Sequence, residues 1–391
     1  MILVMSESGC KFTPIDAGDC GKEITKNVVF KDKGEGVDYV INCMLVISDC
    51  KLKIEPGVHI QFEGAQSGIY VKDKGELDII GKSDKRIILE GKTPEKGSWA
   101  GIIIGSDKDN EIVYADILHA GGTQHQWMYD KAAVGLGFKD KNPKLRLSNC
   151  NIQLSGGHGL YVSSASGNIS RFNDNVFEEN EGYPVYIPFA EIGNIESGTV
   201  YNNPNKPNKE PAIALYGEDA GGNFADLTYS KRLSFINVPY RIMNACIVDG
   251  GHLSFDPGIT MEFMPDTYLG VVGTDSVSSI EAKGTTTNPI TFTKASSDLA
   301  AGWSGIYFAN TSTYNKLSNC IIEYGGKSSP YGTVGIGNII VGGDYSQGKV
   351  TVDDCIIRNS THFGIDKRFD ALFSGNGNLF GNNASGDIGN F

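Results

Sequence analysis

Long apolar runs are missing from this chain of 391 residues. No stretch approaches the ~18 consecutive apolar residues of a membrane-spanning helix, so the sequence predicts no transmembrane segment. Charged residues make up only 20% of the chain, below the usual ~25%. The formal net charge is −12, which argues against nucleic acid or anionic lipid as a partner.

Paired cysteines of the C-x-x-C type are also absent, although the chain has eight cysteines. This absence argues against a zinc site or a redox pair of that spacing. Cys150, Cys320 and Cys355 instead share one context, with Asn or Asp before them and isoleucine within two residues after them. We interpret them as buried free thiols in a stack. Sequence alone leaves two disulfides open: Cys10 with Cys20, and Cys43 with Cys50.

A complete secretion signal is missing from the amino terminus. Residues 1–5 form an apolar stub, shorter than the ~7–15 residues that the apolar region of a signal peptide needs. Cys10 follows Ser8 and Gly9, which resembles the small-small-Cys end of a bacterial lipoprotein signal, although Glu7 argues against it. A trimmed signal and a cytosolic chain both remain open at this point.

Glycine is abundant, with 50 residues, and asparagine numbers 29. Hydrophobic residues make up 40% of the chain, which is too many for a disordered protein and enough for a sizeable core. Short alternating apolar runs are separated by Gly, Asn or Asp, a pattern that predicts β-strands joined by sharp turns. Long helical patterns are lacking, which excludes βαβ architectures.

The sequence contains a long internal duplication. Residues 55–58 (Glu-Pro-Gly-Val) match residues 256–259 (Asp-Pro-Gly-Ile) at an offset of 201, and Trp99 matches Trp303 at an offset of 204. Further matches follow in the same order, and the offset drifts by a few residues, as loops vary while strands keep their register. We interpret the duplicated Trp-x-Gly-Ile motif as core packing.

A shorter repeat of 25 residues lies within the first copy. Its segments are 52–54, 77–79 and 102–104, then 149–152 with 174–177, and 160–162 with 185–187. A coil of this length with two or three short strands is typical of a parallel β-helix. One coil cannot bury its own apolar face, so coils must stack and align like residues. Asparagines at the turns would then form ladders.

Residues 52–58 (Leu-Lys-Ile-Glu-Pro-Gly-Val), Gly75, Gly81 and residues 99–102 (Trp-Ala-Gly-Ile) resemble a known group. They are similar to right-handed parallel β-helix, pectin-lyase-like proteins of bacterial surfaces and secretions. The resemblance covers residues 36–391, twice over. It implies an all-β, right-handed parallel β-helix solenoid of two duplicated halves, located outside the cytoplasm. It implies no single activity, because the group mixes polysaccharide lyases, hydrolases, epimerases and non-catalytic proteins.

The chain is expected to comprise four segments: an amino-terminal lead or cap (1–27), the first β-helix copy (28–195), connecting coils with an exposed Pro/Asn/Lys-rich loop (196–232), and the second copy (233–391).

The Gly157-His158-Gly159 motif resembles the Gly-His-Gly of pectin-degrading glycoside hydrolases with this fold. Those enzymes also carry an Asp-Asp pair and an Arg-x-Lys, which are not found at the corresponding places here, and Phe363 replaces His158 in the second copy. Hydrolysis of a glycosidic bond ordinarily requires two flanking carboxyl groups. His158 is therefore a catalytic candidate beside a simpler interpretation, a solvent-facing histidine in a glycine-flanked turn.

Asp353 and Asp354 are the second catalytic candidates. Polysaccharide lyases use calcium to neutralise a uronate, and calcium needs ~6–8 oxygen ligands. Lyases of this fold also need a basic residue nearby, which Arg358, Lys367 or Arg368 could supply. Calcium is the one cofactor that this alternative would add, and otherwise we expect none. The simpler interpretation of the two carboxylates is a solvated turn.

The loop at 122–131 is the main binding candidate. Aromatic rings stack on sugar faces while nearby amides bind the hydroxyl rim. The alternative is that Trp127 folds back and covers the flank of the β-helix. The candidate binding residues are Gln124, His125, Trp127, Tyr129 and, in the equivalent loop of the second copy, Tyr331.

These observations favour a secreted or surface-exposed protein that is non-catalytic and binds carbohydrate or another surface partner. One alternative is a polysaccharide lyase or glycoside hydrolase acting on an acidic polysaccharide, which would need one asymmetric site. A second alternative is a structural adhesin or stalk, which would present equivalent surfaces in both copies.

Overall fold

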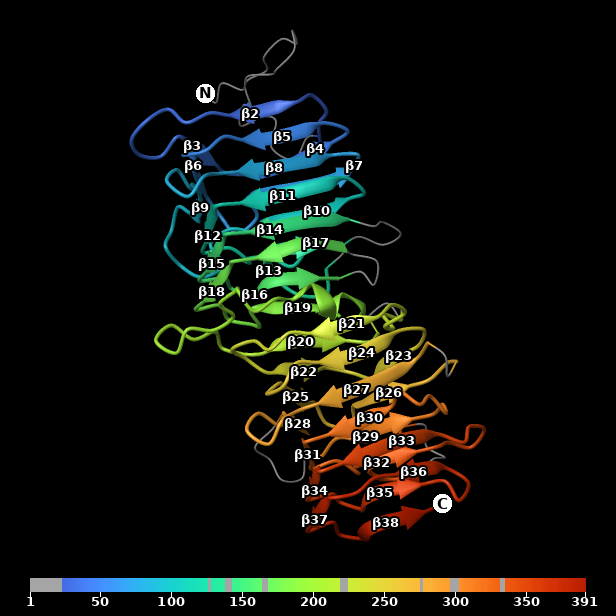
Figure 1. Ribbon diagram of the computed structural model, residues 1–391. Helices are drawn as coiled ribbons and strands as arrows, with labels where there is room; N and C mark the ends of the chain where they lie inside the picture. The colour runs from blue at the N-terminus through green and yellow to red at the C-terminus, as the bar shows by residue number, and fades with distance from the viewer. Residues whose placement is uncertain are drawn as a thin grey trace. The chain divides into compact units, whose positions relative to one another are not determined.

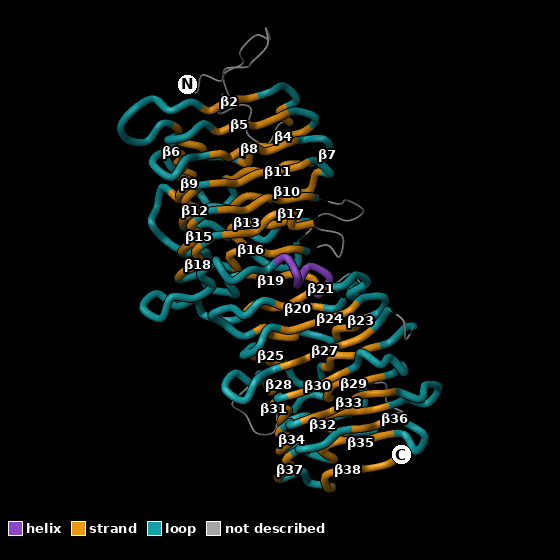
Figure 2. Tube along the Cα trace, in the orientation of Figure 1, coloured by secondary structure: helices purple, strands orange, loops and turns teal. Residues whose placement is uncertain are grey.

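The chain folds as a parallel β-helix, as the sequence predicts. In the described residues the strands are short and pair in parallel. The one helix in this part of the chain is a 3₁₀ helix, η2 (Phe189–Asn194) (Figure 2). No helix in this described part is long and apolar enough to cross a membrane. The computed structural model describes residues 23–125, 128–137, 143–163, 168–218, 224–274, 277–295, 302–330 and 335–391.

Two compact units make up the chain. The first contains the residues up to Ile187 together with Glu196–Ile213, and the second contains Pro188–Ile195 together with Ala214–Phe391. Within the described residues each unit has three sheets, two with six strands and one with seven, and each full coil adds one strand to each sheet (Figure 1).

The sheets of the first unit are named 1A, 1B and 1C, with strands given in spatial order. Sheet 1A holds β2 (Val28–Phe30), β5 (Lys51–Ile54), β8 (Glu76–Ile80), β11 (Asp109–Val113), β14 (Lys144–Ser148) and β17 (Asn168–Asn173). Sheet 1B holds β3 (Tyr39–Ile41), β6 (His59–Phe62), β9 (Ile87–Gly91), β12 (Ala115–Leu118), β15 (Asn151–Gln153) and β18 (Val176–Glu178). Sheet 1C holds β1 (Glu23–Ile24), β4 (Met44–Ser48), β7 (Gly68–Asp73), β10 (Gly101–Ser106), β13 (Ala132–Leu136), β16 (His158–Val162) and β19 (Val185–Pro188).

The sheets of the second unit correspond to these by the duplication. Sheet 2A holds β21 (Lys231–Leu233), β24 (His252–Phe255), β27 (Ser279–Lys283), β30 (Lys316–Ser318), β33 (Lys349–Asp353) and β36 (Leu372–Ser374). Sheet 2B holds β20 (Ile213–Tyr216), β22 (Tyr240–Ile242), β25 (Thr260–Phe263), β28 (Ile290–Lys294), β31 (Cys320–Glu323), β34 (Ile356–Arg358) and β37 (Leu379–Gly381). Sheet 2C holds β23 (Cys246–Val248), β26 (Tyr268–Val271), β29 (Gly305–Phe308), β32 (Gly337–Val341), β35 (Phe363–Lys367) and β38 (Gly386–Asn390).

The 25-residue repeat is confirmed where the turns have equal length. Leu52 pairs with Leu77, Ile152 with Phe177, and Tyr161 with Tyr186. The prediction that residues 102–104 continue the first series is wrong. These residues lie in sheet 1C beside residues 69–71, and Ile79 pairs with Ile112 instead. The reason is that the turns before β9 and before β10 are both longer in this coil, which shifts the spacing from 25 residues between Ile54 and Ile79 to 33 between Ile79 and Ile112.

The duplicated tryptophans are core packing, as expected. Trp99 and Trp303 are fully buried. Trp99 stacks on Phe62 with ring centroids 4.2 Å apart, and Trp303 stacks on Phe263 at 3.9 Å. Each indole Nε1 donates to a backbone carbonyl oxygen, at 2.7 and 2.8 Å respectively. The two copies therefore use one packing device at the same place in the repeat.

Buried asparagines hold the coils together where the chain turns between sheets. Asn180 is completely buried; its Oδ1 accepts from the backbone N–H of Ser155 at 3.0 Å, and its Nδ2 donates to Oδ1 of Asn208 at 2.8 Å. In the second copy, Asn383 accepts from the backbone N–H of Ser360 at 3.1 Å. Each amide thus satisfies backbone groups that the strand ladders leave unpaired.

A second ladder joins asparagines to the cysteines. The backbone N–H of Cys150 donates to Oδ1 of Asn175 at 3.0 Å, and that of Cys355 donates to Oδ1 of Asn378 at 3.0 Å. The N–H of Cys320 points at the Sγ of Cys355 at 3.4 Å. The three thiols are buried and free, which confirms that part of their interpretation. Stacking of one cysteine on the next is seen for Cys320 and Cys355 in the second unit.

The disulfide between Cys43 and Cys50, which the sequence left open, is not formed. The thiol of Cys50 instead lies 2.9 Å from the carbonyl oxygen of Ile24, in the turn between sheets 1C and 1A. Cys10 and Cys20 lie outside the described residues.

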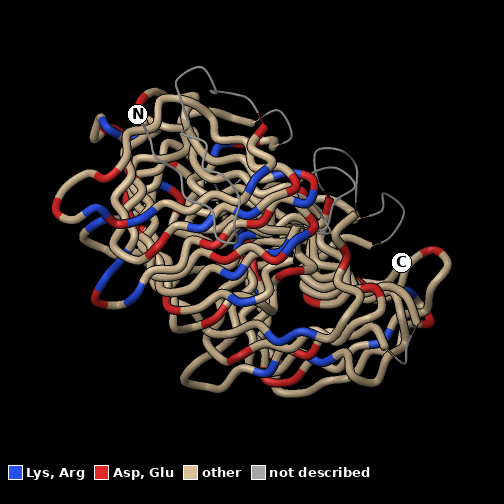
Figure 3. The backbone as a smooth tube through the Cα atoms, turned by 90° about the horizontal axis from the view of Figure 1, so that it is seen from above, with Lys and Arg blue, Asp and Glu red and all other residues tan. Residues whose placement is uncertain are grey.

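Charged side chains of both signs are intermingled in the two units (Figure 3). Many pair between neighbouring coils: Lys51 Nζ lies 2.9 Å from Asp78 Oδ2, and Arg241 lies 2.8 Å from Glu262. Parallel stacking places side chains of successive coils side by side, so opposite charges at one repeat position neutralise each other locally.

Replacing a ladder asparagine should destabilise the fold. Asn180→Ala leaves the buried N–H of Ser155 without an acceptor, so we expect the free energy of unfolding to fall by about 1–3 kcal/mol. Urea unfolding followed by circular dichroism measures this loss. Asn205→Ala, in an exposed turn, is the matched control and should change stability far less; equal effects would contradict the ladder's role.

Candidate functional site

One outward-facing position of sheet 1C repeats on six successive coils. The residues on either side of this position, such as Ile102 and Ile104, point into the core and are fully buried. Strand register places the following residues in one ladder: Val46, Tyr70, Ile103, Gly135, Tyr161 and Tyr186. Four of its members pack with two methionines into an apolar cluster on the outer side of the sheet, here called the aromatic face. Ile103, Met128 and Tyr161 are buried in this cluster, whereas Met44, Tyr70 and Tyr186 are partly exposed.

Gly135 fixes the 122–131 loop on the aromatic face. A Cβ atom built on Gly135 would lie 2.2 Å from the Sδ and Cε atoms of Met128, so the Met128 side chain occupies the space that the missing Cβ leaves. Met128 is buried in this slot, and its backbone N–H donates to the carbonyl oxygen of His125 at 2.9 Å. Part of the loop therefore folds back over the sheet.

His158 is buried, so the prediction of a solvent-facing histidine is wrong. Its exposed fraction is 6%, and its ring lies 5.2 to 5.7 Å from the rings of Tyr161, Tyr183 and Tyr186. The flanking glycines make room rather than form an exposed turn: a Cβ on Gly159 would lie 2.6 Å from a backbone oxygen. The imidazole is part of the packing beside the aromatic face.

Both ring nitrogens of His158 are engaged. Nδ1 accepts from the backbone N–H of Tyr183 at 3.0 Å, which requires a lone pair on Nδ1. Nε2 therefore carries the proton in the neutral ring and donates to Oδ2 of Asp130 at 3.2 Å. The hydrogen bond from His158 lowers the pKa of the Asp130 carboxyl. Neither nitrogen offers a lone pair to a substrate, so this ring cross-links β16 to the loop rather than acting as a base.

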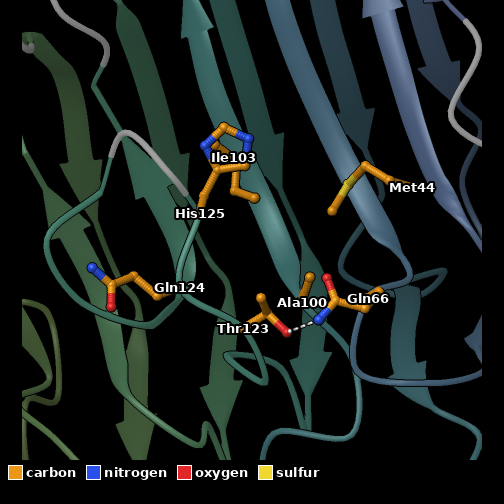
Figure 4. A pocket seen from close by; sticks show the side chains of 7 residues that line it. All are labelled: Met44, Gln66, Ala100, Ile103, Thr123, Gln124 and His125. Atoms are coloured by element: carbon orange, nitrogen blue, oxygen red, sulfur yellow. Dashed lines mark hydrogen bonds between the residues drawn. The ribbon is translucent and has the colours of Figure 1, made fainter.

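A pocket of about 250 Å³ opens at the end of the aromatic face (Figure 4). Within it, Gln66 Nε2 donates to Oγ1 of Thr123 at 3.1 Å, and that hydroxyl donates to the carbonyl oxygen of Ala65 at 2.8 Å. The pocket thus combines an apolar wall with a polar rim that is already ordered. It is lined by Met44, Gln66, Ala100, Ile103, Thr123, Gln124 and His125.

His125 lies against Tyr70, with ring centroids 4.5 Å apart. Burial lowers the pKa of the His125 imidazole and raises the pKa of the Tyr70 hydroxyl to about 12, since each charged form would lose hydration. Nδ1 of His125 is buried and has no hydrogen-bond partner in the described structure. Leaving a buried nitrogen without a hydrogen bond costs free energy of folding. This unpaired nitrogen belongs to a residue that lines the pocket.

The predicted binding residues divide into three groups. Gln124 and His125 both line the pocket, but the Nε2 of Gln124 donates to the Met128 carbonyl at 2.8 Å, and its side chain points away from Gln66 and Thr123 (Figure 4). Gln124 therefore ties the loop together. Tyr129 is exposed beside Met128. Trp127 and Tyr331 lie outside the described residues.

The second set of catalytic candidates is not brought together with its proposed basic partners. Asp353 ends β33 in sheet 2A and forms an ion pair with Lys316 at 3.2 Å, while Asp354 is an exposed turn residue with φ 53°. Arg358, in sheet 2B, is paired with Glu323. Lys367 ends strand β35 in sheet 2C and Arg368 follows it. The Arg368 guanidinium donates to three carbonyl oxygens of a turn.

Metal ligands do not gather at these carboxylates. Across the described part of the chain, no group of three or more His, Cys, Asp or Glu residues is arranged to hold a metal ion.

Among its described residues, the second copy does not repeat the aromatic face. Its equivalent ladder in sheet 2C holds one aromatic residue, Tyr307, where the first copy has three tyrosines. Asp366 stands where the first copy has Tyr161, and it is itself buried, with Oδ2 accepting from the backbone N–H of Ile336 at 2.8 Å. The two copies share a core but differ in this outer ladder, so the aromatic face is a property of the first unit.

Comparison of the chain with protein family models, curated proteins and solved structures gives no match. The resemblance to pectin-lyase-like proteins therefore stays a prediction, whereas the parallel β-helix is observed directly.

Sequence reasoning missed the tyrosines of the aromatic face. The signal was present: Tyr161 and Tyr186 are the middle residues of two apolar segments spaced by 25. When the residues on both sides of a strand position are core residues, the middle one must point outward. Tyr70 and Ile103 extend the same position across unequal turns, which hid them from a search at fixed spacing.

The tautomer of His158 is a direct test of its structural role. We expect long-range ¹⁵N–¹H NMR to show the neutral ring protonated on Nε2, because Nδ1 accepts from Tyr183. Asp130→Asn should leave this tautomer unchanged. Protonation on Nδ1 would contradict the assignment and would return His158 to the list of possible bases.

The titration of His125 tests the pocket's environment. NMR titration should give His125 a pKa below its ordinary 6.5, and Tyr70→Ala should raise that pKa by exposing the ring. Because the unfolded imidazole then takes up a proton at higher pH than the folded one, this group's contribution to stability is lost as pH falls below 6.5. A pKa at or above 6.5 would contradict burial of the ring.

Proposed function

We propose that this protein is a non-catalytic carbohydrate-binding β-helix whose ligand lies on the aromatic face of the first unit. The observation that carries the proposal is the juxtaposition of an outward tyrosine ladder with a pocket rimmed by amide, hydroxyl and imidazole groups. Sugars present apolar ring faces and a hydroxyl rim, so stacking on aromatic rings and hydrogen bonding to such groups are complementary to them.

The spacing of the ladder suits an extended ligand. Tyr161 and Tyr186 lie on neighbouring coils with ring centroids 5.3 Å apart, and the pocket is at the other end of the same ladder. A saccharide chain running across the coils could therefore place one ring in the pocket and another against Tyr186, the partly exposed tyrosine at the other end. Met128 covers the ladder position of Gly135 between them, so the chain would pass over the 122–131 loop.

Two features support binding over catalysis. His158 uses both nitrogens within the fold, and Asp353 and Asp354 stand apart from the basic residues that a lyase would need. The aromatic face occurs in one copy, which favours a single binding region over a stalk with equivalent surfaces in both.

We also propose a location outside the cytoplasm, supported by the motifs that resemble pectin-lyase-like proteins of bacterial surfaces.

A glycan array with the purified protein tests this function. We expect binding to a subset of glycans, with no release of reducing ends and no ultraviolet absorbance from unsaturated uronates in the same samples. Tyr186→Ala should weaken binding by roughly three- to tenfold, since one aromatic contact contributes about 0.5–1.5 kcal/mol beyond the area it buries. Tyr186→Phe, which keeps the ring, should retain most of the affinity.

Tyr345→Ala is the matched control, because Tyr345 is a fully exposed tyrosine in a turn of the second unit. It should bind as the unaltered protein does. Product release would overturn the non-catalytic proposal, and an array without any binding would remove the carbohydrate ligand and leave the structural adhesin or stalk.

A further inference from the structure

We infer that the pocket on the aromatic face accepts one uncharged sugar ring bearing an acetamido group, an N-acetylhexosamine. This inference rests on the proposed function and specifies its ligand. It follows from three properties of the seven lining residues: they carry no formal charge, they form an apolar wall, and they leave an amide oxygen unpaired.

The lining excludes charged sugars. None of the residues that line the pocket is Asp, Glu, Lys or Arg. Its one titratable group, His125, has its pKa lowered by burial and is neutral at neutral pH. A uronate or sialate carboxylate entering this space would lose hydration and gain no opposite charge, which is strongly unfavourable. The pocket therefore discriminates against the acidic polysaccharides that a lyase of this fold would require.

The apolar wall selects a methyl group. Met44, Ala100 and Ile103 provide it, and Ile103 is itself held by the core of the aromatic face. A plain hexose would place hydroxyls here, whereas the methyl of an acetamido group gains by leaving water. The volume of about 250 Å³ is below the ~300–1,000 Å³ of sites for drug-sized ligands, so it suits a single ring.

An unpaired amide oxygen completes the match. Thr123 holds the Nε2 of Gln66 at 3.1 Å, which turns the amide oxygen of Gln66 toward the open pocket as an acceptor. That oxygen has no hydrogen-bond partner within the described structure and is open to the pocket. Nδ1 of His125 is also unpaired, but it is enclosed behind the pocket lining rather than open to it. An acetamido N–H or a ring hydroxyl would therefore pair with the Gln66 oxygen, and Thr123 acts as the positioning residue for Gln66.

Calorimetry and saturation-transfer NMR with defined sugars test this inference. The probes are N-acetylglucosamine, N-acetylgalactosamine and their short oligomers, with glucose and galacturonate oligomers for comparison. We expect at least one N-acetylated series to bind ten times more tightly than glucose oligomers, with the strongest transfer at the acetamido methyl. Galacturonate oligomers should show no binding in the pocket.

Variants separate the pocket from the rest of the face. Gln66→Ala and Thr123→Val should each reduce the affinity for the N-acetylated sugar several-fold, and Thr123→Ser should restore it because the hydroxyl is kept. Thr285→Val, in an exposed turn of the second unit, is the matched control. Gln66 is exposed, so its loss should leave the melting temperature unchanged and any loss of binding interpretable.

The possible outcomes separate the N-acetylhexosamine inference from the proposed carbohydrate-binding function on which it rests. Sugar binding that is weakened by Tyr186→Ala but is indifferent to the acetamido group and to Thr123→Val would overturn the inference and keep the proposed function. Preference for galacturonate oligomers would likewise overturn the N-acetylhexosamine inference and keep the proposed carbohydrate-binding function. Failure of every sugar to bind would overturn both.

Discussion

The fold depends on satisfying backbone groups where each coil turns from one sheet to the next. Within the described strands, backbone N–H and C=O groups pair with the neighbouring coils, but at the corners the chain bends away from that ladder. Side chains of Asn175 and Asn180 in the first copy, and Asn378 and Asn383 in the second, supply the missing partners. Because asparagine has both a donor and an acceptor, one residue per coil can bridge its two neighbours.

The alignment of successive coils also determines how side chains are arranged on the surface. Once corners align, a position on one strand lies beside the same position on the next, about 4.8 Å away, and a ladder of side chains results whether it faces the core or the solvent. The inward ladders must be apolar in both copies, so the duplication preserved them. The outward ladder is free to diverge, and Tyr161 in the first copy corresponds to Asp366 in the second. One core thus supports two chemically different faces.

The same logic explains which expectations from the sequence held. Core positions could be predicted because burial repeats them: the paired tryptophans, the buried cysteines and the segments at 52–54 and 77–79 were all identified. Segment 102–104 was misplaced because turn lengths follow no periodic constraint. His158 was misread because glycine is common both in turns and where bulky rings need room, and the sequence does not separate these causes. The ring occupies space that a Cβ on Gly182 would fill, 2.4 Å from its Nδ1.

The candidate site arises where a corner is not closed by an asparagine. Gln66 and Thr123 bond across two turns of the first unit and leave an amide oxygen outward, while His125 packs on Tyr70 with Nδ1 unpaired. A structural corner of this fold consumes all its polar groups, as Asn180 does. A polar group that is ordered by a neighbour and still unpaired, such as the amide oxygen of Gln66, does not contribute to stacking, and its position beside the aromatic face gives the site its orientation. Function in this fold is therefore best sought where the ladders of backbone-satisfying side chains are interrupted.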